Sequence, residues 1–178
     1  MFLGDGRVSL RPLTADDADG PYPGWFNDAE VCRWNGHHVL PYTRALALEY
    51  IAAVQRGPDL VLAIELEGRH VGNVALQDRD TLHRTADLAI VVGDRTAWGS
   101  GVGLAAARLV VGHGFAALGL HRITAATFAE NAAMRRLAER LGMVEEGVRR
   151  AARFKHGAHR DVVEYGLLAT EWVRPSPT

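Results

Sequence analysis

A glycine-rich turn between an apolar strand and a long helix is the feature that most constrains this chain. The β-branched run from Thr85 to Gly93 predicts a strand, and Trp98-Gly-Ser-Gly-Val-Gly103 follows it. From Leu104 onward apolar residues recur at spacings of three or four, which predicts a helix that ends at Gly119. The first N–H groups of a helix lack internal partners and its dipole adds positive potential there. We therefore expect the turn to bind a diphosphate, with ordinary turn chemistry as the alternative.

Two other phosphate-binding motifs do not fit this turn. No Gly-Lys-Ser/Thr follows the glycines, so the spacing is not that of a Walker A loop. The preceding strands, Leu60 to Leu66 and His70 to Leu76, read as a hairpin around Glu67-Gly68-Arg69. A Rossmann dinucleotide site instead opens a parallel unit, so it is disfavoured.

The order of the predicted elements indicates an α+β fold. Tyr22 to Tyr42 is rich in aromatic and turn residues and reads as short helical turns and a loop. The other predicted helices are 15–19, 43–57 and 131–141, and the other strands are 8–11, 123–128, 143–149 and 162–168. We expect a mixed, mostly antiparallel twisted sheet of about seven strands flanked by about four helices. No linker is evident, so residues 1–178 are expected to form a single domain with a frayed tail at 173–178.

Composition narrows the class of protein further. The 178 residues are 48% hydrophobic and 23% charged, with a net charge of -1, which is typical of soluble domains large enough to bury a core. This charge offers no broad cationic field for nucleic acid. No apolar run is long enough for a membrane span and no leader pattern opens the sequence, so a cytoplasmic protein is expected. Cys32 is the only cysteine, which excludes a disulfide scaffold and favours a filler role.

The second half of the chain resembles a known family. A strand, the turn Trp98 to Gly103, a long helix, a strand, then Asn131 and an amphipathic helix ending in Leu141-Gly142-Met143 are similar to the GCN5-related N-acetyltransferase (GNAT) family. Gly119-Leu-His-Arg122 and Gly142-Met-Val-Glu-Glu-Gly147 resemble its branch of ribosomal-protein N-terminal, polyamine and nucleotide-linked amino-sugar acetyltransferases. The likeness is strong from Thr85 to Leu168 and weak before Leu60, where acceptor specificity usually resides.

The resemblance implies acetyl-CoA as cosubstrate and assigns residues to it. Asn131 would contact the pantetheine arm, or serve as a simple helix N-cap, or do both. Trp98 stands where the family has Arg or Gln, so its side chain receives no role. The strand beside the arm would contribute Ile90, Val91 and Val92, and the pyrophosphate would lie on backbone N–H groups of Gly99, Ser100, Gly101, Val102, Gly103 and Leu104.

The implied reaction is attack of a neutral amine on a thioester, which needs a base and a protonated leaving group. Asp87 stands where this branch commonly has Glu and is the leading base, directly or through water; a solvated strand-end carboxylate is the alternative. The substitutes Glu65, Asp78 and Asp80 read as surface residues. Ala138 stands where many relatives have the Tyr that protonates the CoA sulfur, and alanine cannot donate a proton. Either Tyr165 or a water donates the proton instead, or CoA leaves as a thiolate.

Several further residues have two readings. Trp25 and Trp34, with Phe26, line an acceptor groove or pack the N-terminal core. His37, next to His38, contributes to an acceptor pocket or belongs to a polar loop, and the pair lacks a third metal ligand, so no metal is expected. Arg135, Arg136 and Arg140 reach the adenosine 3′-phosphate or form an outer charged face. Among these three we select Arg135.

The sequence thus predicts an acetyl-CoA-dependent N-acetyltransferase that acts on a primary amine. The near-zero charge and Ala138 disfavour polyamines, so a small amine metabolite is preferred over a protein N-terminus. A non-catalytic acyl-CoA-binding module is the rival from another class. Dimers are common in the family, which makes a homodimer a candidate assembly. The acceptor, the length of the acyl group and the general acid are not identified by the sequence.

Overall fold

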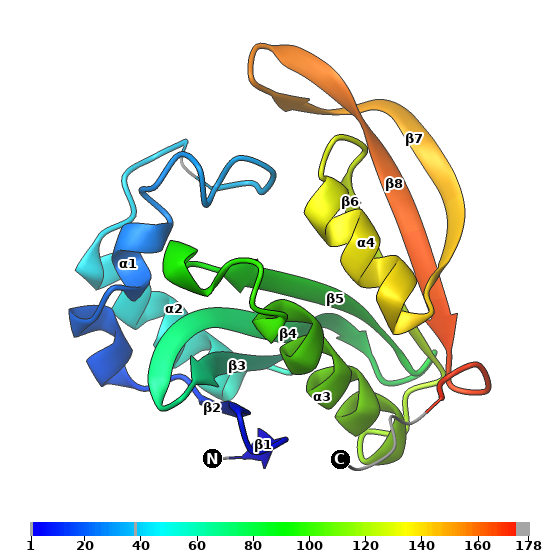
Figure 1. Ribbon diagram of the computed structural model, residues 1–178, viewed down its shortest axis with the longest axis horizontal. Coiled ribbons are helices and arrows are strands. Elements are labelled where there is room, and N and C mark those ends of the chain that lie inside the picture. The colour runs from blue at the N-terminus through cyan, green and yellow to red at the C-terminus, as the bar shows by residue number, and fades with distance from the viewer. Residues whose placement is uncertain (1, 38, 174–178) are drawn as a thin grey trace.

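The computed structural model describes residues 2–37 and 39–173 and is built on one eight-stranded sheet (Figure 1). The strand order is β1-β2-β3-β4-β5-β6-β8-β7, and every neighbouring pair is antiparallel except β5 with β6. The expected α+β class and mostly antiparallel sheet are confirmed. The strands are β1 (Leu3–Gly4), β2 (Val8–Pro12), β3 (Leu60–Leu66), β4 (Arg69–Asp80), β5 (Thr85–Val92), β6 (Arg122–Phe128), β7 (Val144–Lys155) and β8 (Ala158–Leu168).

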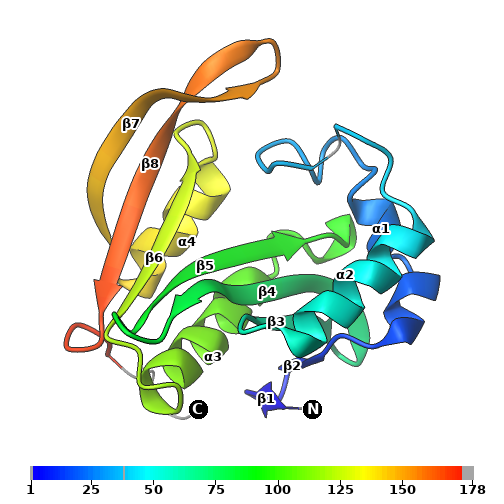
Figure 2. The same ribbon diagram turned by 180° about the vertical axis from the view of Figure 1, so that it is seen from behind.

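Helices cover both faces of this sheet. Figure 1 shows α3 (Val102–Ala116) against one face, and the view from behind in Figure 2 shows α2 (Arg44–Arg56) on the other. The apolar stripe of α3 packs into the larger core with β2 to β6, whereas α1 (Tyr22–Trp25) and α2 enclose a smaller core around Tyr22 and Ile51. The remaining helices are α4 (Ala132–Leu141) and two short 3-10 helices, η1 (Ala15–Asp19) and η2 (Arg95–Ala97).

The sheet has eight strands instead of about seven because the two-residue β1 pairs with β2. The last two strands are also longer than predicted and form a hairpin that projects beyond the rest of the sheet (Figure 1). The β7–β8 register breaks between Arg149 and Arg153, where Ala151 has a positive φ of 47°. Because of this irregularity, the sequence pattern does not indicate the full length of β7. Of the expected tail at 173–178, all but Val173 lies outside the described residues, as does His38.

The two central strands separate soon after they begin. β5 and β6 pair only through Thr85 to Asp87 with Arg122 to Thr124, and the later parts of both strands diverge (Figure 2). One edge of β5 is therefore left without a neighbouring strand beyond Asp87. This gap lies between α3 and α4, where the glycine-rich turn begins the long helix. Among the described residues, no helix combines the length and hydrophobicity that crossing a bilayer requires.

Candidate active site

The glycine-rich turn leaves the start of α3 open. Gly99 and Gly101 have φ values of +76° and +85°, which L-residues adopt only with strain, and a Cβ built on either would meet no other atom within 4 Å. Gly101 is the N-cap, and it supplies no side-chain cap to the first-turn N–H groups. The carbonyl of Ser100 accepts a hydrogen bond from the Arg7 guanidinium at 3.3 Å, which fixes the turn to the neighbouring strand end. Ser100 N and Val102 N donate to the Ala97 carbonyl and to Ser100 Oγ, at 3.3 Å and 3.4 Å, so the N–H groups of Gly103 and Leu104 are the ones this turn leaves open to an anion. Binding of a diphosphate there stays a prediction.

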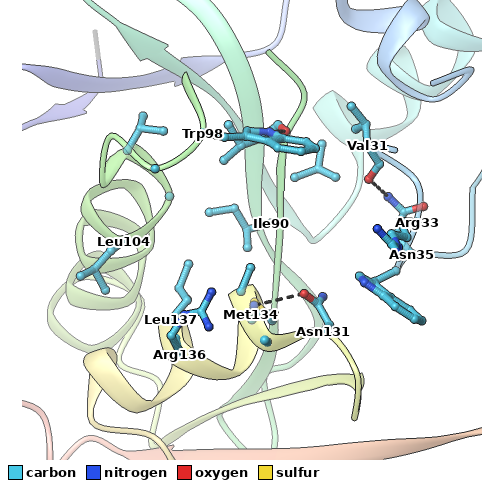
Figure 3. Close-up of a pocket in the computed structure, with 18 of the residues that line it drawn as sticks. Val31, Arg33, Asn35, Ile90, Trp98, Leu104, Asn131, Met134, Arg136 and Leu137 are labelled. Carbon is cyan, nitrogen blue, oxygen red and sulfur yellow. Dashed lines mark hydrogen bonds between the residues drawn. The ribbon is translucent and has the colours of Figure 1, made fainter. Parts of the chain in front are cut away.

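A cavity of about 780 Å³ lies against this turn, within the size range of small-molecule sites. Figure 3 shows its walls converging from the turn at Trp98, the strand residue Ile90, and the start of α4 at Asn131 and Met134. A fourth wall comes from the loop after α1, at Val31 to Asn35. Of the predicted cofactor residues, the following line the cavity: Ile90, Val91, Val92, Gly99, Gly101, Val102, Gly103, Leu104 and Asn131.

The exposed edge of β5 offers backbone groups to the cavity. The carbonyls of Ala86 and Val92 accept hydrogen bonds from Thr124 Oγ1 and Trp98 Nε1, so both point away from β4. Because backbone direction alternates along an antiparallel strand, Ile90 also turns its N–H and C=O toward the gap. Val91 turns its own toward β4, where it pairs with Asn73. Of the three strand residues predicted to pair with a pantetheine arm, Ile90 therefore presents backbone groups on the open side and Val91 does not.

The side chain of Trp98, for which the family resemblance implies no role, has a defined position at the cavity. Its Nε1 donates to the Val92 carbonyl at 2.8 Å, and the indole remains 43% exposed at the cavity wall. The guanidinium carbon of Arg95 lies 5.7 Å from the ring centroid, a cation–π contact. The indole thus takes up the carbonyl of Val92, the last one on β5 that points away from β4. An extended ligand at this end of the strand would therefore pair with the backbone of Ile90.

Asn131 is the N-cap of α4. Its Oδ1 accepts from Met134 N at 3.2 Å (Figure 3). Its Nδ2 donates to Thr127 Oγ1 at 2.9 Å. The capping alternative left open by the sequence is therefore realised, and the residue still lines the cavity. Its contact with a cofactor stays a prediction.

Arg135 does not line the cavity, and its predicted contact with the cofactor stays untested. Its guanidinium donates to the Tyr165 hydroxyl at 3.2 Å and lies 3.5 Å from Glu145, on the side of α4 facing β7 and β8. Arg136 and Arg140 line the cavity in its place. The physical reason is the geometry of the helix, in which successive side chains point in directions about 100° apart. Neighbouring arginines on α4 therefore lie on different sides of the helix.

Asp87 lies at the point where β5 and β6 separate. Its neighbours Ala86 and Leu88 are buried in the core with α3, so the carboxyl group points to the opposite face of the sheet. Its Oδ1 accepts from Thr124 Oγ1 at 3.1 Å. Burial raises the pKa of Asp87 above its usual range, while the Thr124 hydrogen bond acts in the opposite direction. Asp87 does not line the cavity itself; Ile90, three residues along the strand, does.

The other predicted carboxylates are engaged elsewhere. Glu65 accepts from the Arg11 guanidinium and the Ser9 hydroxyl, at 2.8 Å and 2.9 Å. Asp80 accepts from His83 N at 2.7 Å in the β4–β5 turn. These contacts agree with the reading of Glu65 and Asp80 as residues outside the reaction site. Asp78 is exposed, and after burial its charge is the next cause that raises the pKa of Asp87.

The predicted acceptor residues separate into two groups. Trp25 is 6% exposed in the smaller core and faces the His70 ring at 4.9 Å, so it packs and does not line the main cavity. Trp34 lines the cavity and contacts the rings of Phe128 and His156 at centroid distances of 5.8 Å and 5.4 Å. His37 lies beside Phe26, with centroids 4.4 Å apart, and desolvation followed by nearby Lys155 lowers its pKa.

The groups considered for the leaving-group proton do not reach the cavity. Ala138 is fully buried in the core between α4 and the sheet. Tyr165 is 2% exposed, and its hydroxyl accepts the Arg135 hydrogen bond. Cys32 is buried beside the Trp25 carbonyl at 3.4 Å, and burial raises the pKa of its thiol, as suits a core residue. Within the described ranges, no three His, Cys, Asp or Glu side chains are arranged to hold a metal ion.

Sequence reasoning missed part of the cavity wall. The loop after α1 contributes Glu30, Val31, Arg33 and Asn35, which follow no periodic pattern that would have indicated a shared wall. On α4, Ala133, Leu137 and Arg140 recur at spacings of three and four and line the cavity together. That spacing was the available signal, because residues so spaced share one side of a helix.

Comparisons with known proteins agree with this geometry. The sequence model of the acetyltransferase (GNAT) domain matches residues 7–144. An uncharacterized N-acetyltransferase of Bacillus subtilis, YoaA, is 28% identical over 94% of this chain and 96% of its own length. A spermidine N(1)-acetyltransferase of Escherichia coli is 24% identical over 96% of this chain and 91% of its own length. The chain belongs to the GNAT acetyltransferase family.

Solved structures share the fold along the whole chain. RimJ of Mycobacterium smegmatis, in complex with CoA-disulfide, superposes with a TM-score of 0.81 at 25% identity, covering 95% of this chain and 85% of that one. The chain is therefore an N-acetyltransferase of the acetyl-CoA-dependent class, as the family resemblance implied.

Proposed function

We propose that this enzyme transfers the acetyl group of acetyl-CoA directly to the primary amine of a small metabolite. The observation that carries the proposal is the uncapped start of α3 behind two positive-φ glycines, facing a cavity of small-molecule size. The pyrophosphate would lie on the N–H groups from Gly99 to Leu104. The pantetheine arm would extend along the open edge of β5 and pair with Ile90.

Asp87 is the proposed general base. Its raised pKa brings its proton affinity closer to that of a base working near neutral pH, and its side chain lies on the sheet face opposite α3. The short Asp side chain, which is absent from the cavity wall, favours proton transfer from the amine through a water molecule. The amine nitrogen then forms the new C–N bond as the thioester C–S bond breaks.

The leaving sulfur would depart as a thiolate and be protonated by water. Neither Ala138 nor the buried Tyr165 is placed to donate a proton into the cavity. With an ordinary thiol pKa of about 8.5, leaving as a thiolate costs about 2 kcal/mol at neutral pH. This cost is small against the barrier reductions that enzymes provide.

Incubation with acetyl-CoA and a panel of primary amines tests the proposed function. We expect free thiol to appear in proportion to acetylated amine, with no covalent acetyl-enzyme, because direct transfer needs no protein nucleophile. The panel includes small amines, spermidine and a peptide with a free N-terminus. Tight CoA binding by calorimetry with no turnover on any amine would instead establish the non-catalytic module.

The α4 arginines allow a matched test of the cofactor site. Arg136→Ala is expected to weaken CoA binding by about five- to tenfold, since a charged contact to phosphate is worth about 1 kcal/mol or more. Binding of dephospho-CoA, which lacks the 3′-phosphate, should be little changed. Arg135→Ala removes the same side chain from the neighbouring position outside the cavity and should leave both affinities unaltered. Equal losses for both ligands would place Arg136 away from the 3′-phosphate.

A further inference from the structure

The β7–β8 hairpin carries an unbroken basic segment. Residues 149–160 include Arg149, Arg150, Arg153, Lys155 and Arg160 and contain no Asp or Glu. This concentration of charge contrasts with the near-neutral balance of the whole chain. It lies on the projecting part of the hairpin, which neither the proposed cofactor site nor the proposed base uses (Figure 1).

Only part of this charge is neutralised within the protein. Arg149 pairs with Glu164 at 2.8 Å and Arg160 with Glu130 at 3.1 Å. The Lys155 ammonium donates to a backbone carbonyl, that of His37, at 3.3 Å. Among the described residues, Arg150 and Arg153 have no carboxylate within 4 Å, so the hairpin keeps excess positive charge.

The tip of the hairpin is fixed beside the cavity. His156 Nε2 lies 2.9 Å from the Arg33 carbonyl, and the Lys155 bond to His37 joins the same loop. Trp34 packs between Phe128 and His156 and lines the cavity from this loop. The basic segment therefore contacts the loop that forms one wall of the cavity, the side on which we place the acceptor.

The charges of the facing elements do not cancel this excess. In the loop, Glu30 pairs with Arg33 at 3.2 Å. Arg153 lies across the hairpin from Arg160, whose guanidinium pairs with Glu130 at the cavity wall. Burial is the main cause of the raised pKa of Asp87, and the charge of Arg153 acts in the opposite direction, so Arg153 also lies within electrostatic reach of the proposed base. Asp161 accepts from Ala151 N at 2.8 Å inside the hairpin. Within the part of the chain that the structure describes, Arg153 is thus a member of the basic segment that has no ion-pair partner.

We propose that the acceptor is a primary amine that also carries an anionic group, a carboxylate or a phosphate, which Arg153 holds while the amine reaches Asp87. The inference rests on the proposed function and names the substrate class for its open acceptor side. An excess of one sign of charge beside a cleft selects ligands of the opposite sign. A polycationic acceptor would meet Arg150, Arg153 and Lys155 as like charges.

Pairs of amines that differ only in the anion test this inference. Glucosamine 6-phosphate is compared with glucosamine, and γ-aminobutyrate with n-butylamine. We expect kcat/KM to favour the anionic member of at least one pair by about tenfold, and the favoured pair identifies phosphate or carboxylate. The preference should shrink in 0.5 M NaCl, because the partly exposed charges are screened.

Charge reversal assigns the preference to Arg153. Arg153→Glu should lower the ratio of kcat/KM between the anionic and the neutral amine by about tenfold or more, with both amines measured on the same variant so that any effect on the base cancels. Arg56→Glu makes the same change in net charge at the exposed end of α2 and should preserve the preference.

Several results would overturn the inference. They are equal rates within both pairs, a preference that persists in Arg153→Glu, or spermidine as the best acceptor. Each of these results contradicts the inference about the acceptor but is compatible with the proposed acetyl transfer. CoA binding without turnover on any amine is distinguishable from these, because it removes the proposed function and the inference together.

Discussion

Replacing Asp87 with Asn is expected to lower kcat by about 10²- to 10⁴-fold, the range that removal of a general base produces. CoA affinity should be unchanged, since the side chain lies outside the cavity that would hold the cofactor. Thr124 can still donate to the Asn carbonyl oxygen, so the local geometry is retained. Asp80→Asn, in the exposed β4–β5 turn, is the matched control and should be near wild type.

A general-base role for Asp87 also predicts the direction in which activity changes with pH. The base works in its ionised form, and burial raises the pKa of Asp87, so wild-type kcat/KM should fall as pH decreases through that raised pKa. The residual activity of Asp87→Asn should lack this acidic limb. Retention of both the rate and the limb would assign the base to another group.

The same shift in pKa predicts the stability of the variant. A carboxyl group with a higher pKa in the folded protein than in the unfolded chain destabilises the fold above the unfolded pKa, and this effect is absent below it. Asp87→Asn should therefore unfold at neutral pH at a temperature equal to or above that of the wild type. A loss of activity without a loss of stability separates a catalytic role from a structural one.

Gly103→Val is expected to reduce CoA affinity by about 100-fold or more while the protein remains folded. Gly103 has no positive φ, and a Cβ there would lie 3.5 Å from the side chains of Leu137 and Val92, an ordinary contact distance. The added methyl groups would occupy the cavity at the first turn of α3, where the pyrophosphate would approach the backbone. Isothermal calorimetry with CoA measures the loss.

Gly112→Val provides the matched control in the same helix. A Cβ at Gly112 also makes ordinary contacts, at 3.7 Å and 3.8 Å from Trp172, on a part of α3 remote from the turn. Both variants should keep wild-type circular dichroism, and the control should bind CoA normally. Gly101→Val is a poorer test, because its φ of +85° would strain any β-branched residue. Normal CoA binding by Gly103→Val would exclude the proposed pyrophosphate site.

The elements with strong local signals were predictable from the sequence. The apolar spacing placed both α3 and α4. Gly142 ends α4 at φ +85° as expected, whereas α3 ends at Ala116, before the predicted Gly119. The strands with continuous apolar runs, such as β3 and β6, were found as well. In these segments local preference and tertiary packing favour the same structure.

Other features depended on tertiary contacts that no local pattern records. The exposed outer half of β7 is held by pairing with β8, which the polar sequence around Arg150 does not indicate. Trp25 and Trp34 look alike in the sequence, but packing against Tyr22 buries the first and the hairpin tip leaves the second at the cavity. The separation of β5 from β6 at Asp87 and the burial that raises the pKa of that residue likewise depend on the assembled sheet.

The short contact between β5 and β6 also links ligand occupancy to the integrity of the fold. Only three residue pairs join the two parts of the sheet, and an extended cofactor arm in the gap would supply backbone bonds that the protein itself lacks. A ligand that binds only the folded chain adds about 2.7 kcal/mol of stability at 100 times its Kd. The cosubstrate would then act as a reversible part of the sheet, and the folded fraction of the enzyme would rise with the concentration of acetyl-CoA.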